Sequence, residues 1–381
     1  MNIFACEKNR QMDKRVAVRQ CDEYDLKKIT GIIAGIYEST GGPDPHGRKV
    51  LLKPNILSDA PPEKCITTHP VVVEAMIRYL QSKGAEVIVG DSPSVHLKNF
   101  KPVKCGIDEV CRRTGVEWTD FRNNPVEIKS GRLKIKIASA ARKADLIISL
   151  PKFKNHELAY FTGAVKNTLG LVPGFIKAKQ HALYQNRIRF SEFLVDLNEA
   201  VMPDYFLMDG IYAMEGPGPA NGFPKKTAVL IGSANPLALD IIACTIAGYN
   251  ATDIPTNSIA LARKKWLSSP GEIIYDGPAI ESLIRKDFVR IPITTGKNVS
   301  LQFLIRRIRP LRKLERRPVF IHDNCTGCLK CVKICPVNAI KPHETRQNWI
   351  VLTDSKCIRC FCCSEVCNDN AIEIRRKLFG V

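Results

Sequence analysis

Residues 325–336 read CTGCLKCVKICP, and residues 357–367 read CIRCFCCSEVC. In both stretches four cysteines are separated by two, two and three residues. An Asn-Ala-Ile triplet follows each stretch, at 338–340 and at 370–372. Since the first cysteines of the two stretches are 32 residues apart, the C-terminal region is an internal duplication.

The spacing of these cysteines indicates what they bind. Thiolates are soft ligands that select iron–sulfur clusters, copper(I) or zinc. Structural zinc usually takes pairs of ligands separated by a longer loop, which fits this spacing poorly. Three cysteines at two-residue intervals suit three corners of a cubane, and the fourth then reaches the other cluster. We therefore expect two [4Fe–4S] clusters, one on Cys325, Cys328, Cys331 and Cys367 and the other on Cys357, Cys360, Cys363 and Cys335.

These residues resemble the bacterial two-[4Fe–4S] ferredoxin family, roughly over 318–376, and the resemblance implies a small α+β domain over 318–381. The sequence departs from the family in two places. Asn368 follows Cys367 where the family usually has proline. Cys362 is an additional thiol beside a ligand, either a small packing residue or a spare ligand.

The cysteine distribution and the apolar stretches of the sequence indicate where in the cell the protein is expected. Nine of the 15 cysteines fall between Cys325 and Cys367, and the other six are scattered, so we expect those six to be buried apolar residues. The N-terminus has no apolar core of a signal peptide, and the most apolar stretch, 227–249, is interrupted by Pro236 and Asp240. These features predict a cytoplasmic protein with no transmembrane segment.

The net charge is +19, and the densest basic run lies in the stretch 291–317, which holds seven arginines and lysines between 306 and 317. A membrane-surface helix or a nucleic-acid patch are two interpretations of this stretch. The third is a basic linker that docks on an acidic surface, and Pro310 favours it because proline interrupts a long helix. We expect the linker, and we do not expect nucleic-acid binding.

Residues 1–290 are expected to form an α/β domain with a mostly parallel, three-layer sheet, because short apolar runs alternate with helical patterns. The expected strands are 50–52, 86–89, 144–149, 205–208 and 228–231. The expected helices are 70–83, 191–201 capped by Ser191, and 236–248.

Each expected strand is followed by polar residues punctuated by glycine or proline. The five strand ends are Lys53-Pro54-Asn55, Gly90 to Pro93, Pro151 to His156, Asp209-Gly210 with Glu215 to Pro219, and Gly232 to Asn235. Ligands of open α/β sheets bind outside the carboxyl ends of the strands, so these five ends predict one composite pocket. No G-x-G-x-x-G follows a strand, so a standard dinucleotide fingerprint is absent.

The expected pocket is rich in lysines, which suits a small anionic ligand such as a carboxylate or phosphate. In an extended chain Lys152, Lys154 and His156 point to the same side. The acidic residues either balance the lysines, bind a metal or take a proton. As catalytic candidates we name His69, Lys152, Lys154, His156, Lys166, Asp209 and Glu215. As ligand-binding candidates we name Lys53, Asn55, Asp91, Asn167 and Asp240.

Several motifs of this domain together resemble the domain-of-unknown-function 362 family. They are Lys53-Pro54-Asn55, Thr67 to Pro70, Gly90 to Pro93, Leu150 to His156, Gly163 to Asn167, Met208 to Gly210, Ala213 to Gly216, and Ala238 to Asp240. The resemblance implies an uncharacterised iron–sulfur centre protein with a ferredoxin module at one end. It implies no particular activity.

The leading hypothesis is a ferredoxin-coupled oxidoreductase that passes electrons between the clusters and a small anionic substrate or cofactor in the pocket. A redox partner protein, such as a ferredoxin or a flavoprotein, would exchange electrons with it. The alternative is a non-catalytic electron-transfer or scaffold subunit that docks a redox partner. The sequence does not indicate the oligomeric state.

Overall fold

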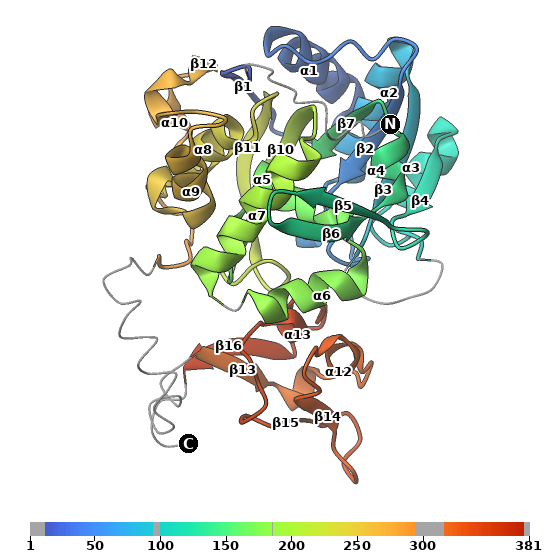
Figure 1. Ribbon diagram of the computed structural model, residues 1–381, viewed down its shortest axis with the longest axis vertical. Coiled ribbons are helices and arrows are strands. Elements are labelled where there is room, and N and C mark those ends of the chain that lie inside the picture. Colours follow the sequence, from blue (N-terminus) through green and yellow to red (C-terminus); the bar gives the residue numbers. More distant parts are fainter. Residues whose placement is uncertain (1–11, 94–99, 185, 294–315, 377–381) are drawn as a thin grey trace.

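The computed structural model describes residues 12–93, 100–184, 186–293 and 316–376. Most of the expected basic linker, 294–315, lies outside these residues. A ten-stranded, mostly parallel sheet forms the centre of the larger part, in the order β12-β1-β11-β10-β7-β2-β3-β4, with β8 and β9 branching from β10 (Figure 1). These strands are β1 (Arg15–Gln20), β2 (Lys49–Pro54), β3 (Glu86–Asp91), β4 (Glu117–Asp120), β7 (Leu146–Leu150), β8 (Lys152–His156), β9 (Tyr160–Thr162), β10 (Tyr205–Glu215), β11 (Phe223–Ser233) and β12 (Ile274–Asp276).

Helices cover both faces of this sheet, as the three-layer prediction requires. The first layer holds α1 (Leu26–Ser39), α2 (Pro70–Ser82) and α3 (Ile107–Thr114). The second holds α5 (Ala164–Asn167), α7 (Arg187–Val201), α8 (Pro236–Ile246) and α9 (Pro255–Arg263). Strand β2 shows how one sheet serves two cores: Val50 and Leu52 pack toward α1 and α2, and Leu51 packs on the other side.

The remaining elements of this part lie around the sheet. They are the antiparallel pair β5 (Val126–Ser130) and β6 (Leu133–Ile137), and the helices α4 (Ser139–Lys143), α6 (Gly174–Leu183) and α10 (Ile280–Leu283). The sheet is parallel from β10 to β4, whereas β10 and β11 pair antiparallel.

Local signals explain where the helices begin. His69 caps α2, with Pro70 at its first position, and Asn235 caps α8, with Pro236 in the same place. The predicted cap of α7 is wrong. This helix begins at Arg187, and the side chain of Asn186 accepts the hydrogen bonds of its first turn, whereas Ser191 is buried inside the helix.

The ferredoxin-like part is small and α+β, as predicted. It pairs β13 (Arg316–Phe320) with β16 (Ile372–Arg376) and β14 (Ile340–Pro342) with β15 (Ile350–Leu352), all antiparallel. Its two short helices are α12 (Lys330–Ile334) and α13 (Cys362–Glu365).

The duplication seen in the sequence recurs in the backbone of this part. Gly327 and Leu329 flank Cys328, and both have left-handed φ values, of 69° and 57°. At the equivalent places beside Cys360, Arg359 and Phe361 have φ values of 60° and 61°. Left-handed residues curl the chain, so both stretches wrap around a central space in the same way.

The two parts of the chain are joined by polar contacts, and α13 lies on the side of the ferredoxin-like part that faces the large sheet (Figure 1). The Arg316 guanidinium donates two hydrogen bonds to the Glu157 carboxylate, at 2.6 and 3.1 Å. Asn221 Nδ2 donates to Ser364 Oγ at 3.0 Å. Ser58 Oγ donates to Asn368 Oδ1 at 2.9 Å, and Lys64 Nζ donates to the Asn368 carbonyl at 2.5 Å. Asn368 therefore has a role that proline would not fill.

Candidate functional site

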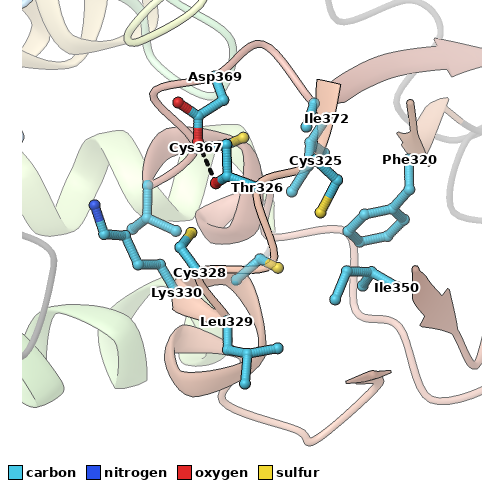
Figure 2. A pocket seen from close by; sticks show the side chains of 13 residues that line it. Phe320, Cys325, Thr326, Cys328, Leu329, Lys330, Ile350, Cys367, Asp369 and Ile372 are labelled. Atoms are coloured by element: carbon cyan, nitrogen blue, oxygen red, sulfur yellow. Dashed lines mark hydrogen bonds between the residues drawn. The ribbon is translucent and has the colours of Figure 1, made fainter. Parts of the chain in front are cut away.

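Two cavities in the ferredoxin-like part sort eight cysteines into two groups. The first is partly open to solvent and is lined by Cys325, Cys328, Cys331 and Cys367. Figure 2 shows Cys325, Cys328 and Cys367 around it, with Thr326 donating a 3.0 Å hydrogen bond to Asp369 at its edge. The second is also partly open and is lined by Cys335, Cys357, Cys360 and Cys363, together with Cys362.

These linings fit thiolate-bound iron–sulfur clusters. Each cavity has three cysteines from one stretch and the fourth from the other, in the arrangement that the spacing predicts. The backbone N–H of Ala339 donates to Cys335 Sγ at 3.2 Å, a contact typical of cluster sulfurs. Among the residues that the structure describes, no three His, Cys, Asp or Glu side chains lie close enough to hold a single metal ion.

A buried polar node joins the ends of β2 and β3. Lys53 Nζ, fully buried, lies 3.2 Å from Asp91 Oδ1 and donates to Asn167 Oδ1 at 3.1 Å. Asn55 Nδ2 donates to the same oxygen of Asn167 at 3.0 Å. Asp91 also accepts the backbone N–H groups of Ile56 and Ser92. Burial lowers the pKa of Lys53, while Asp91 acts in the opposite direction.

A second node surrounds Asp209 in the middle of β10. Lys152 Nζ donates to Asp209 Oδ2 at 2.7 Å, and the Tyr24 hydroxyl donates to Asp209 Oδ1 at 3.1 Å. The Tyr24 ring stacks on His69, with ring centroids 3.4 Å apart. Burial lowers the pKa of His69 to about 4, so its ring is neutral at pH 7.

Strand β8 connects this node to the ferredoxin-like part. Its alternate residues Lys152, Lys154 and His156 are all buried, while Phe153 between them packs against Phe161 in the apolar core. Lys154 Nζ donates to the Ile66 carbonyl at 2.6 Å. The period of two predicted from the sequence therefore matches an observed strand.

His156 ends this strand and meets the ferredoxin-like part directly. Its Nδ1 accepts the backbone N–H groups of Leu158 and Ala159, so Nε2 carries the hydrogen. Nε2 lies 3.3 Å from Oε1 of Glu365, with the two side chains 0% and 8% exposed. Glu365 is the last residue of α13, which also holds Cys363.

Further lysines lie in the electrostatic field of the same carboxylate. Burial lowers the pKa of Lys154 well below its ordinary value, and Lys166 lowers it further, whereas Glu365 raises it. Burial also lowers the pKa of Lys166, against Glu365. Lys177 on α6 donates to the Ser92 carbonyl, and burial lowers its pKa to about 8.

Two predicted residues have other surroundings. Asp240 accepts the backbone N–H groups of Ala164 and Val165, at 2.6 and 3.1 Å, and so holds the start of α5; burial raises its pKa to about 7. Glu215 accepts the backbone N–H of Val289 at 2.8 Å. Both contacts are with backbone groups, and neither includes a lysine of the two nodes.

Three buried side-chain oxygens near these lysines have no hydrogen-bond partner among the described residues: Asn55 Oδ1, Thr67 Oγ1 and Thr162 Oγ1. Thr67 follows the residue whose carbonyl accepts from Lys154, and Thr162 pairs with Lys154 across β8 and β9. Buried polar groups without partners are costly, so they point to a ligand or water at this place.

Sequence reasoning missed Tyr24, Lys177 and Glu365. Tyr24 lies on a loop before α1, and its isolated position gives no pattern to detect. Lys177 lies on a helix that was not predicted. Glu365 lies between Cys363 and Cys367, two predicted cluster ligands, and the only indication of a role was a charged residue at this place.

Comparisons with known proteins agree with this description. The family model described as "Domain of unknown function (DUF362)" matches residues 50–245, and the model described as "4Fe-4S binding domain" matches residues 318–341. The thylakoid-associated protein sll1697 of Synechocystis sp. (strain ATCC 27184 / PCC 6803 / Kazusa) is 30% identical over 310 residues, which is 77% of this chain and 97% of that protein. The chain therefore belongs to the DUF362 family and has a C-terminal 4Fe–4S binding domain, a domain of electron-transfer proteins.

Two solved structures have low structural similarity to this chain. The lactate racemase apoprotein from Thermoanaerobacterium thermosaccharolyticum has a TM-score of 0.42 and 14% identity over 62% of this chain and 57% of its own. A Thermotoga maritima protein has a TM-score of 0.37 and 16% identity over 54% of this chain and 55% of its own. The chain thus spans little more than half of either protein, and these scores support no statement about function. No helix in the described part of the chain is long and apolar enough to span a membrane.

Proposed function

We propose that this protein is a redox enzyme in which two [4Fe–4S] clusters exchange electrons with a small anionic ligand at the lysine-rich strand ends. In this proposal the α/β domain, 1–290, holds the ligand and the ferredoxin-like domain, 318–381, holds the clusters. The basic linker, 291–317, joins them in a cytoplasmic protein. The observation that carries the proposal is the contact of Glu365, two residues from Cys363, with His156 on the lysine-bearing strand.

Charge supports an anionic ligand. Five lysines lie in the two nodes and around α13: Lys53, Lys152, Lys154, Lys166 and Lys177. Three carboxylates face them, from Asp91, Asp209 and Glu365. Buried charges are stable only when paired, so two lysines in excess favour either their neutral form or a bound anion.

In this proposal electron transfer, anion binding and proton delivery are carried out by different groups of the protein. The bound clusters supply one-electron transfer. Lys154 and Lys166 would hold the anion, and the Thr162 hydroxyl, which has no partner in the described part of the chain, would donate a hydrogen bond to it. The Asp209 node would deliver a proton, because Lys152 and the Tyr24 hydroxyl both donate to one carboxylate and lie 3.2 Å apart.

The test begins with the metal content. Anaerobic protein should contain about eight iron atoms per chain, with electron paramagnetic resonance signals of two interacting clusters. Stoichiometric zinc without sulfide would exclude the proposal. Lys154→Ala and Lys166→Ala should retain their iron but bind oxalate and inorganic phosphate more weakly in calorimetric titrations. The control is Lys27→Ala, an exposed lysine on α1.

If both variants bind these anions as tightly as the wild type does, the scaffold alternative is favoured. In that case the strand-end lysines stabilise the fold, and the clusters serve only an external partner.

A further inference from the structure

A carboxylate from one part of the chain already lies in the lysine site of the other. Glu365 comes from α13, and it is 8% exposed although glutamate is almost never buried without partners. Its Oε1 lies 3.3 Å from His156 Nε2, which carries the ring hydrogen and therefore presents a donor. The Glu365 side chain thus has the chemistry of a bound carboxylate ligand.

Three lysines respond to this carboxylate. It raises the pKa values of Lys154, Lys166 and Lys177 against the effect of burial. The lysines are on three different elements, β8, α5 and α6, so they are not one row along a helix. Since the site retains more lysines than carboxylates, its field favours anions beyond Glu365 itself.

The contacts around α13 are polar. Besides the His156 contact, the hydrogen bonds seen among the described residues include Asn221 with Ser364 and the Ile372 carbonyl, Asn368 with Ser58 and Lys64, and Arg316 with Glu157. Polar interfaces between parts of one chain permit relative movement more readily than large apolar interfaces. Such an interface allows a single side chain of α13 to be exchanged for a competitor.

We propose that the lysine site is specific for carboxylates, and that Glu365 is its internal occupant, displaced when a ligand carboxylate binds to His156, Lys154 and Lys166. This inference rests on the proposed function and names its ligand class. The ligand takes over the His156 N–H and the lysines, and no covalent bond forms or breaks. Glu365 then sets the affinity of the site, because every ligand competes with it.

The test is calorimetric titration of the holoprotein with acetate, oxalate, inorganic phosphate and sulfate. Glu365→Gln has the same shape without the charge and should bind acetate and oxalate about ten-fold more tightly, because the competing occupied state is weakened. Glu365→Ala removes the occupant and should bind them at least as tightly. The matched control, Glu373→Gln, loses a carboxylate that pairs with Arg375 at the surface and should match the wild type. Iron content and absorption spectra show whether each variant retains its clusters.

The outcomes separate the two proposals. Tighter carboxylate binding in both Glu365 variants, with phosphate and sulfate unchanged, supports the inference. Unchanged or weaker carboxylate binding overturns it, and so does equal tightening for phosphate, which would indicate a general anion site. If neither the wild type nor any variant binds an anion, the proposed function itself loses its ligand site.

Discussion

Tyr24 and His69 stack face to face, with ring centroids 3.4 Å apart and ring planes 7° from parallel. The two residues come from different loops, before α1 and before α2, and both touch Asp209: Tyr24 through its hydroxyl and His69 through its backbone N–H. His69 also caps α2, because its Nδ1 accepts the N–H of Val71. His69 therefore takes part in a helix start, an aromatic stack and the Asp209 node.

This position makes stability depend on pH. Burial lowers the pKa of His69 to about 4, against an ordinary 6.5, so the unfolded chain binds a proton that the folded chain does not between these values. Stability should therefore fall as pH falls from 6.5 to 4, by about 3 kcal/mol from this residue. His69→Asn retains a helix cap and should remove this part of the dependence. Urea unfolding at pH 7 and at pH 5 measures how much the free energy of unfolding changes with pH. An equal change in the variant and the wild type would contradict the attribution to His69.

Lys177 predicts a different pH dependence. Its pKa is lowered to about 8, so it loses its proton above that pH in the folded protein while the unfolded chain keeps it up to about 10.5. Stability should rise with pH between 8 and 10.5, and anion affinity should fall over the same range because a cation is lost. Lys177→Met should weaken anion binding at pH 7, and the anion affinity of this variant should fall less steeply above pH 8 than that of the wild type. The titrations are done by calorimetry with oxalate, and a decline as steep as that of the wild type would argue against Lys177.

Substitution of a predicted cluster ligand and of the additional cysteine should have different effects on iron content. Cys328→Ser removes a cavity-lining cysteine and should lose or convert one cluster, destabilising a small domain that depends on its clusters. Cys362→Ser is the matched control, because this thiol is additional to the four that the spacing assigns to its cavity. Iron analysis should give about four fewer iron atoms, or a three-iron signal, for the first variant and about eight iron atoms for the second. Equal iron loss would make Cys362 a ligand.

Breaking the buried pair of Lys152 and Asp209 should strongly destabilise the α/β part. Asp209→Asn leaves a buried ammonium without its counter-ion and should cost about 3–5 kcal/mol. The control is Glu86→Gln, which breaks a pair with Lys49 of similar length, 2.9 Å, whose side chains are 68% and 39% exposed. It should cost less than about 1 kcal/mol. Chemical unfolding compares the two, and similar losses would mean that the Lys152 pair is not desolvated.

Secondary-structure elements with a periodic sequence pattern could be predicted from the sequence, whereas contacts between distant loops could not. The strand–helix alternation predicted the three-layer sheet, since apolar runs such as 87–89 must be buried on both faces. The cap of α7 was misplaced, because Ser191 is a good cap in isolation, whereas Asn186 lies five residues earlier and its side chain accepts the hydrogen bonds of the first turn.

The candidate site was partly predictable for the same reason. Lys152, Lys154 and His156 share one side of a strand, which their spacing indicates. Tyr24 reaches Asp209 across 185 positions of the chain, and Glu365 reaches His156 from another part of it. No local pattern encodes such distances, because they depend on how finished elements pack together.

Asn368 makes the two halves of the duplicated module unequal. Pro336 follows the last cysteine of the first half, and a proline ring has no side-chain acceptor for Ser58. An exchange of residues 325–340 with 357–372 would therefore preserve all eight cysteine positions yet remove both the Asn368 bond and the Glu365 contact. The two halves of the repeat therefore differ in their surroundings: the second half contacts the α/β part through Asn368 and Glu365, whereas Cys328 of the first half is exposed.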